Sequence, residues 1–482
     1  MQVALLLQNH VRAAFRGRWR GTYLAVLAAG SGVRLFGLAS QLIVLIILNR
    51  MLSKDSFGDM MIAFGFYRLM AMAFGIGTSL VLIYHVSRHP GDRTAEIRLH
   101  RYSAALSVAA IALVALAGFV LAEPIAHALV KPGLEAWFRE LAPFGIFTAL
   151  LVTSTGALEG RSRIAESIAL GEAAPNAVRM VLLPAVALSG LPNAYIAHAM
   201  TVSVLLPWLW SARALWDRSV GGWQRWTFWD LSYCGKSVAT TLFANQLGAV
   251  DILVAGTLFS SEIVADYAIA ARIAALYPFF QVALLKRFSP RAAHMIETKD
   301  RAALRQEFAL CHKLIVGCSA LTVAGILCVG PFLLPLFGNY ASALSFLVWL
   351  AIPAFVASFY STSDRLLIIA GHANVPLAIT VGNFTMLVTM PFVTAPLLGP
   401  TAIPVAMAVA FSLLYPLAAA RVHTLFDLRT IGPRDLLLIG AGVTVLVSYA
   451  ITGTAMLGIA SVSALSAIAL YCCLSAIRRT GA

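Results

Sequence analysis

Charged residues are scarce in this sequence: Asp, Glu, Lys and Arg make up 12% of its 482 residues, whereas 60% are hydrophobic. Soluble domains usually carry about 25% charged residues, so an ordinary soluble protein is excluded. The apolar runs are continuous, and many exceed the roughly 20 residues with which a helix spans a bilayer core. The alternating segments of about ten residues that mark membrane barrels are missing. The composition therefore predicts an all-α polytopic membrane protein.

Motifs for hydrolysis or metal binding are missing too. Gly235-Lys236-Ser237 resembles the end of a phosphate-binding loop, but Asp230 stands where the first glycine is required. No HExxH or GxSxG motif occurs. The cysteines lie in or beside apolar segments without metal-ligand spacing, and we interpret them as buried hydrophobic side chains; they are Cys234, Cys311, Cys318, Cys328, Cys472 and Cys473. We expect no enzymatic activity, no metal and no cofactor.

The long apolar runs predict about fourteen transmembrane helices. Their expected ranges are 23–48, 58–85, 102–122, 139–159, 166–189, 192–215, 234–258, 262–286, 310–336, 341–362, 372–397, 400–421, 433–453 and 455–477. The loops between them are short, the longest outer one being about 16 residues. The protein is therefore expected to act inside the bilayer, because neither side carries a soluble domain.

The basic residues predict the orientation. Of the 35 Lys and Arg residues, 26 fall on one side of this topology, five lie within spans, and only Arg50, Lys54, Lys131 and Arg139 fall on the other side. Short cytoplasmic loops are enriched in Lys and Arg, so we place both termini in the cytoplasm of a bacterial inner membrane. The same placement explains the net charge of +14 without nucleic-acid binding.

An internal repeat predicts two lobes. Residues 52–63 and 259–270 are identical at four of twelve positions, and both stretches lie at the start of the second helix of a hairpin. The offset of six helices gives two lobes of equal orientation, as in some transporters; chance similarity between two hairpins is the alternative. The predicted organisation is a cytoplasmic amphipathic segment (1–22), an N-lobe of six helices (23–215), an interfacial linker (216–233), a C-lobe of six helices (234–421) and two further helices with a short tail (422–482).

Four arginines are predicted near the middle of spans: Arg34, Arg68, Arg179 and Arg272. Each costs roughly 2.5–3.5 kcal/mol at the centre of a membrane helix, unless it faces partners or a wet cavity. Gln41 shares a helix face with Arg34, and Lys236 shares one with Asp251. Lys236 could equally be an interfacial anchor, because it lies near a helix end.

Acidic residues within the spans are fewer, namely Glu172, Asp251 and Asp266. They are candidates for ion coupling or for structural ion pairs between helices. The basic excess predicts an anionic guest, since a guanidinium can donate two parallel hydrogen bonds to phosphate. Candidate binding residues are Arg34, Arg68, Arg179, Arg272, Gln41 and Lys236.

Two stretches resemble a known family. The segment from Gly37 to Asp59, with Gln41, Arg50-Met51-Leu52-Ser53 and Phe57-Gly58, is similar to the opening of bacterial polysaccharide transporters of the O-antigen flippase type. The run from Pro396 to Pro400, continuing into Ala402 and Ala406, resembles the turn between helices 11 and 12 of that family. The family belongs to the multidrug/oligosaccharidyl-lipid/polysaccharide exporter superfamily.

The resemblance implies a V-shaped pair of six-helix lobes around a central cavity. It implies an oligosaccharide linked to polyprenyl pyrophosphate as substrate, with membrane lipids around it and a polysaccharide polymerase or export complex as a further partner. Cationic residues of helices 1, 2 and 8 line the cavity of such flippases, and Arg34, Arg68 and Arg272 occupy those helices here. The last two helices resemble those that flank the lipid tail in a related branch.

Two other functions fit the sequence less well. A cation-coupled multidrug antiporter of the same superfamily would need acidic residues in the N-lobe cavity, but the first helix has none. A membrane polysaccharide polymerase typically carries a large outer loop with catalytic residues, and the longest outer loop here is too short. The sequence does not specify the sugar, the coupling ion or the pathway.

Overall fold

The computed structural model describes residues 23–88, 92–161, 163–213, 217, 219–244, 249–340, 342–428 and 431–480, and side chains of the first helix only from residue 36 onward. All secondary structure in these ranges is helical. The predicted amphipathic segment 1–22 lies outside the described residues.

The described residues of the first half form nine α-helices. They are α2 (Tyr23–Met51), α3 (Lys54–Arg88), α4 (Arg93–Val120), α5 (Ala122–Ala128), α6 (Pro132–Glu140), α7 (Ala142–Gly160), α8 (Ile164–Ile168), α9 (Ala174–Leu188) and α10 (Ala194–Ser211). The second half contains α11 (Phe228–Ala244), α12 (Asp251–Leu258), α13 (Ser261–Ala274), α14 (Phe279–Glu297), α15 (Arg301–Leu333), α16 (Ala343–Ile369), α17 (Asn374–Leu398), α18 (Ala402–Phe426), α19 (Pro433–Thr452) and α20 (Ala455–Thr480).

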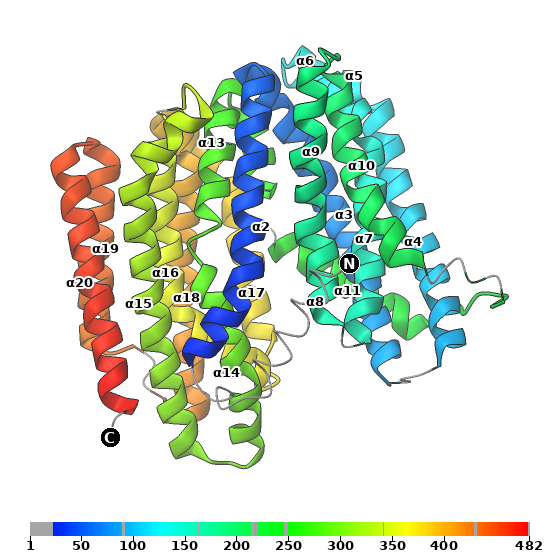
Figure 1. Ribbon diagram of the computed structural model, residues 1–482. Coiled ribbons are helices and arrows are strands. Elements are labelled where there is room, and N and C mark those ends of the chain that lie inside the picture. The colour runs from blue at the N-terminus through cyan, green and yellow to red at the C-terminus, as the bar shows by residue number, and fades with distance from the viewer. Residues whose placement is uncertain are drawn as a thin grey trace.

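The long helices form two bundles that stand side by side (Figure 1). The first bundle contains α3, α4, α7, α9 and α10, and the second contains α13, α15, α16, α17 and α18. Helix α2 stands between them and contacts α9 of the first bundle and α14, which continues from α13. Helices α19 and α20 flank the second bundle, with α20 packed on α15. We call the end that carries α5 and α6 the upper end, and the end that carries the α14–α15 turn the lower end.

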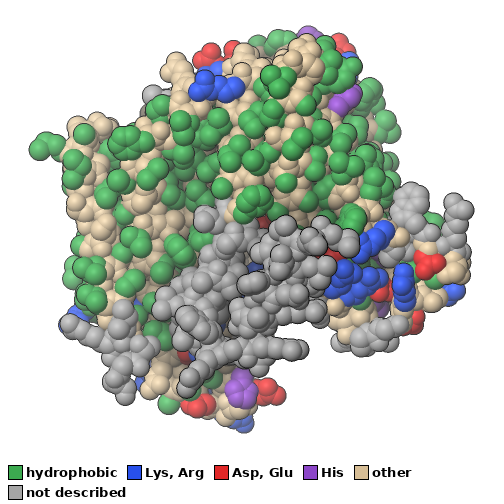
Figure 2. Space-filling model, viewed as in Figure 1, with side chains coloured by type: hydrophobic (Ala, Val, Ile, Leu, Met, Phe, Trp, Pro, Cys, Tyr) green, Lys and Arg blue, Asp and Glu red, His purple; other side chains and the backbone are tan. Residues whose placement is uncertain are grey.

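The protein is a multi-pass membrane protein. Among the described residues, eight helical stretches are long and apolar enough to cross a membrane, and α13 with α14 makes a ninth if this bent pair is one span. One of the eight stretches holds both α17 and α18, which pack against each other. Figure 2 shows hydrophobic side chains over the middle of the molecule and charged groups toward its ends. The predicted count of about fourteen spans stays a prediction.

Two predicted spans are interrupted within the residues that the structure describes. The span at 166–189 is divided into α8, a π-helical turn (Ala169–Ala173) and α9. The span at 234–258 contains α11 and α12, with residues 245–248 between them outside the described part. The span at 262–286 is divided into α13 and α14, which are bent by 42°. Pro278 is the N-cap of α14 and has no backbone N–H to donate, which favours the break at this point.

The lower half of the seventh predicted span packs on the first bundle. Asp230 at the start of α11 accepts a hydrogen bond from His85 of α3 at 2.7 Å. A Cβ atom at Gly77 of α3 would lie 2.9 Å from the Cys234 sulfur, so the two helices are in close contact. The linker is held as well, because Arg101 donates to the carbonyl oxygens of Asp217 and Val220. The predicted start of the C-lobe at residue 234 stays a prediction.

The two repeat stretches meet at the upper end. Ser261 of α13 donates a hydrogen bond to Asp59 of α3 at 2.5 Å. A Cβ atom at Gly58 would lie 1.9 Å from the Ser261 carbonyl oxygen, so the approach requires glycine. Lys54 of α3 forms a 2.9 Å ion pair with Asp266 of α13. These upper contacts join the two bundles.

Candidate functional site

Three arginines predicted from the sequence converge where the bundles meet. Arg68 comes from α3, Arg179 from α9 and Arg272 from the last turn of α13. Arg272 lies within electrostatic range of both others, and Arg179 within range of Arg68. Arg68 lies 14 positions after the start of α3, roughly 20 Å along the helix. Both bundles therefore contribute to one cationic cluster deep inside the molecule.

Two stacked phenylalanines separate two of these arginines. The rings of Phe64 and Phe144 stack with centroids 5.0 Å apart. The Arg272 guanidinium carbon lies 5.7 Å from the Phe64 centroid, and that of Arg179 lies 5.7 Å from the Phe144 centroid. A cation over an aromatic face is attracted by the negative potential of the ring. The phenylalanine pair therefore supports both guanidinium groups with apolar carbon.

Polar neighbours fix the orientation of Arg179. Its Nε donates to the Ser203 hydroxyl of α10 at 2.8 Å, and one terminal nitrogen donates to the Asn176 side-chain oxygen at 3.2 Å. Asn176 in turn donates to the Gly37 carbonyl oxygen of α2 at 3.4 Å. Helix α2 is thereby connected to the arginine cluster.

Arg272 is the most deeply buried member of the cluster, with 8% of its surface exposed. Its Nη2 atom has no hydrogen-bond partner among the described residues. An unsatisfied donor on a buried charge is costly, so such groups usually bind a ligand or water. The arrangement suits an anionic oxygen.

Two acidic residues accompany the arginines. Asp251 is fully buried within electrostatic range of Arg272, and it accepts hydrogen bonds from the Tyr267 hydroxyl and the Ile252 backbone N–H, both at 2.8 Å. Glu172 is exposed in the π-helical turn and lies within range of Arg68. Glu172 thus lies near a charged residue of another helix, α3.

The other candidates lie elsewhere. Asp266 belongs to the upper contacts, where it binds Lys54 and accepts a hydrogen bond from Ser342 at 2.5 Å. Lys236 is exposed on α11 and Gln41 is half-buried on α2, and no contact with the three arginines is found for either within the described part of the chain. Arg34 lies in α2, but its side chain lies outside that part.

Sequence reasoning missed the residues that hold the arginines. Phe64 lies one helical turn before Arg68 on the same face of α3. This spacing is only a weak indication that Phe64 lies beside the arginines. The sequence contains no such indication for Phe144, Asn176 and Ser203, because their contacts with the arginines depend on helices that are distant in the chain. Across the described ranges, no group of three His, Cys, Asp or Glu side chains is placed to hold a metal ion.

A family profile described as "Polysaccharide biosynthesis protein" matches residues 47–337, more than half of the chain. The chain belongs to this family. The matched part of this polysaccharide biosynthesis protein includes Arg68, Arg179 and Arg272 together with both phenylalanines. No protein of the curated collection matches the chain.

Solved structures share the fold of this family member. A multidrug resistance MATE family transporter of the MOP superfamily, in an inward-facing conformation, is 16% identical, with a TM-score of 0.68 over 82% of this chain and 96% of that one. The lipid II flippase MurJ, in an inward closed conformation, is 13% identical, with a TM-score of 0.67 over 93% and 99%. A MOP superfamily transporter from Pyrococcus furiosus is 14% identical, with a TM-score of 0.61 over 85% and 97%. The chain therefore has the fold of a MOP superfamily transporter.

Proposed function

We propose that this protein is a flippase that moves an oligosaccharide linked to polyprenyl pyrophosphate across the bacterial inner membrane. The product would serve the synthesis of a cell-surface or secreted polysaccharide. The observation that carries the proposal is the convergence of Arg68, Arg179 and Arg272, from both bundles, around a stacked phenylalanine pair.

The cluster suits a pyrophosphate group. Guanidinium groups bind phosphate oxygens through two parallel hydrogen bonds, and Arg272 has a buried donor available. The rings of Phe64 and Phe144 add no competing acceptor, so the donors stay available to a guest. A prenyl chain can remain in lipid while its pyrophosphate enters, because the cluster lies between two bundles rather than inside one.

The contacts between the bundles support alternating access as the transport mechanism. The upper contacts keep the upper end closed in this conformation. We place the lower end in the cytoplasm, because the α14–α15 turn there carries several Lys and Arg residues. Substrate would enter from that side, and the upper contacts would separate to release it outward.

Ion coupling is assigned to the acidic neighbours of the cluster. Asp251 and Glu172 are close enough to Arg272 and Arg68 for protonation or cation binding to alter the charge that the substrate meets. Asp266 would act instead by releasing Lys54 at the upper end.

The proposal is tested by deleting the gene and locating the lipid-linked oligosaccharide in inner-membrane vesicles of both orientations. Glycan-modifying reagents that cannot cross the bilayer report the leaflet. We expect complete units to accumulate on the cytoplasmic face, with relief by the wild-type gene but not by an Arg272→Ala variant of equal abundance. Accumulation on the outer face would point to polymerisation, and no accumulation with increased drug sensitivity would point to a multidrug antiporter.

A further inference from the structure

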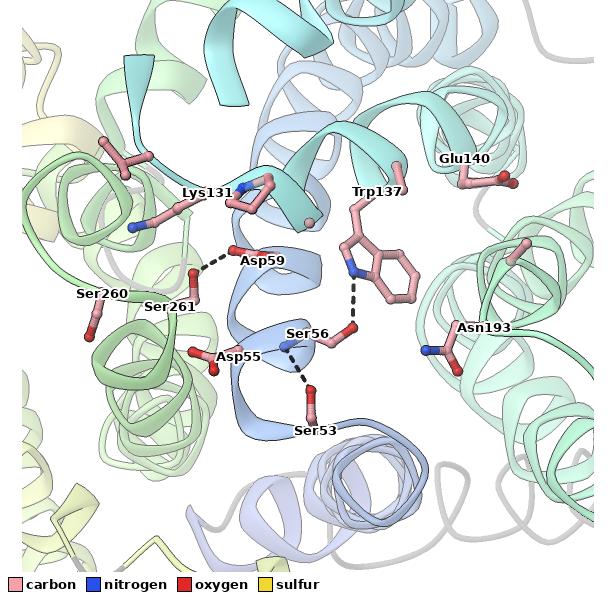
Figure 3. A pocket seen from close by; sticks show the side chains of 15 residues that line it. Ser53, Asp55, Ser56, Asp59, Lys131, Trp137, Glu140, Asn193, Ser260 and Ser261 are labelled. Atoms are coloured by element: carbon pink, nitrogen blue, oxygen red, sulfur yellow. Dashed lines mark hydrogen bonds between the residues drawn. The ribbon is translucent and has the colours of Figure 1, made fainter. Parts of the chain in front are cut away.

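A cavity lies at the upper end, apart from the arginine cluster. Its volume is about 630 Å³, and it is lined by the start of α3, the α5–α6 turn, α6, the start of α10 and the start of α13 (Figure 3). Ligand sites commonly occupy about 300–1,000 Å³. None of the arginines of the cluster lines it. The cavity therefore has room for a ligand group that the cluster does not bind.

The charges that line this cavity oppose those of the cluster. Asp55, Asp59 and Glu140 contribute three carboxyl groups, and Lys131 is the one basic side chain in the described lining. The ammonium group of Lys131 is turned to the Phe259 carbonyl oxygen, to which it donates at 2.5 Å, and the residue is only 7% exposed. Burial lowers the pKa of Lys131, although the nearby Asp59 and Asp55 oppose this effect. The lining is thus predominantly acidic and disfavours phosphate.

Glycine at position 133 makes room for a buried carboxylate. Asp59 is 5% exposed, and its Oδ1 accepts the hydrogen bond from Ser261. A Cβ atom at Gly133 would lie 2.6 Å from the other oxygen, Oδ2. The α5–α6 turn thus closes over Asp59 without displacing it.

The remaining lining is rich in uncharged hydrogen-bonding groups. Ser53, Ser260 and Asn193 are exposed at the cavity and can both donate and accept. The indole of Trp137 stands beside them and donates to the Ser56 hydroxyl at 3.3 Å. Figure 3 shows Ser53, Trp137 and Asn193 around one space, with Ser260 at its edge. Hydroxyl, amide and carboxylate groups beside an aromatic wall suit a ligand with many hydroxyl groups.

We propose that this cavity is a binding site for an uncharged or amine-bearing sugar of the transported glycan. The inference rests on the proposed function and divides the substrate between two sites: the arginine cluster binds pyrophosphate, and the upper cavity binds sugar and excludes anions. Ser260 and Ser261 come from α13 and most of the other lining from the first half, so the sugar site is complete only while the upper ends are in contact. Separation of the bundles then releases the glycan.

The test is ligand binding to the full-length protein in lipid nanodiscs by saturation-transfer NMR. The sugar probes are N-acetyl-D-glucosamine, D-glucosamine and D-glucuronic acid, and inorganic pyrophosphate probes the arginine cluster. We expect glucuronic acid to bind at least about tenfold more weakly than the other sugars, and Asp55→Ala to weaken sugar binding about tenfold, as expected for a lost hydrogen bond to a charged group. Glu262→Ala is the matched control, because this acidic residue is exposed at the same end outside the cavity.

A second variant, Gly133→Ala, should also weaken sugar binding, since its methyl group displaces the Asp59 carboxylate. Sugar binding that withstands both substitutions, equal binding of glucuronic acid, or no sugar binding to the wild-type protein would overturn the inference. The two proposals fail separately. If the wild-type protein binds pyrophosphate through Arg272 but binds no sugar, the flippase proposal stays in place. If it binds sugar through Asp55 but binds no pyrophosphate, the role of the arginines is contradicted.

Discussion

At the scale of single residues, the proposed binding chemistry rests on the guanidinium groups. Buried arginine is costly in a membrane protein unless partners or a guest compensate for it. Here the compensation is uneven: Arg179 has two side-chain acceptors, whereas one terminal nitrogen of Arg272 has none among the described residues. Arg272 is therefore the member of the cluster on which a guest should depend most.

Arg272→Lys tests whether the planar fork matters beyond its charge. Lysine keeps the positive charge but cannot form two parallel hydrogen bonds. We expect pyrophosphate affinity to fall about tenfold in Arg272→Lys and further in Arg272→Ala, measured by isothermal titration in nanodiscs. Arg305→Lys is the control, because Arg305 is exposed at the lower end. Equal pyrophosphate affinity of the wild type and Arg272→Lys would show that only the positive charge contributes to binding.

Phe64→Leu tests the support beneath Arg272. Leucine removes the aromatic face that lies 5.7 Å from the guanidinium carbon while it retains an apolar side chain. A cation–π contact contributes about 0.5–2 kcal/mol, so pyrophosphate affinity should fall roughly two- to thirtyfold. Phe392→Leu, at an exposed ring of α17, should change nothing. An unaltered pyrophosphate affinity in a folded Phe64→Leu protein would show that Phe64 does not contribute to the binding site.

Close helix packing determines the geometry at the scale of elements. Helix α3 is the central element of the first bundle and contacts α4, α7 and α11 as well as α13 of the second. Thr78 of α3 shares hydrogen bonds with Ser107 of α4 and Thr153 of α7 at 2.8 and 2.7 Å. Small residues allow such approach in membrane proteins. The position of Arg68 therefore depends on the contacts of Thr78, which lies about three turns further along α3.

Gly156→Ala should destabilise the α3–α7 contact. The added Cβ atom would lie 2.0 Å from the Ser79 hydroxyl oxygen and 2.8 Å from the Ser79 Cα atom, so the backbone must move. Overpacking of this kind costs about 1–3 kcal/mol, which unfolding in SDS would measure. Gly325→Ala on α15 meets no atom within 4 Å and should be neutral or stabilising. Equal stability of the two variants would contradict the close contact.

The Lys54–Asp266 ion pair joins α3 to α13 and should hold the upper end closed. Asp266→Asn removes the charge and should shift the population toward an open upper end by roughly two- to fivefold, the effect of about 0.5–1 kcal/mol. Double electron–electron resonance would measure this shift from the distance between spin labels at positions 260 and 193. The labels would be attached to cysteines introduced there, in a protein whose six native cysteines have been replaced. Arg139→Gln is the control, because its pair with Glu135 stays within α6. An unchanged distance distribution in Asp266→Asn would show that the ion pair does not hold the upper end closed.

At the scale of the whole molecule, most of the helical architecture could be predicted, because continuous apolar runs identify membrane helices directly. The interruptions could not. Composition reports neither the π-helical turn before α9 nor the bend between α13 and α14. The arginines could be recognised by their cost in a membrane. Their phenylalanine partners could not, since Phe64 and Phe144 meet only after α3 and α7 pack.

The central claim is that the arginine cluster moves a pyrophosphate-linked sugar between leaflets, and proteoliposomes test it most directly. The purified protein would be reconstituted with a short-chain polyprenyl-pyrophosphate disaccharide that carries a fluorophore on the sugar, and a membrane-impermeant quencher would report its leaflet. Wild type should expose the fluorophore on both faces within the assay, whereas Arg272→Ala should leave the inner half protected. Equal translocation by the two proteins, or none by wild type together with uptake of a cationic dye, would contradict the account.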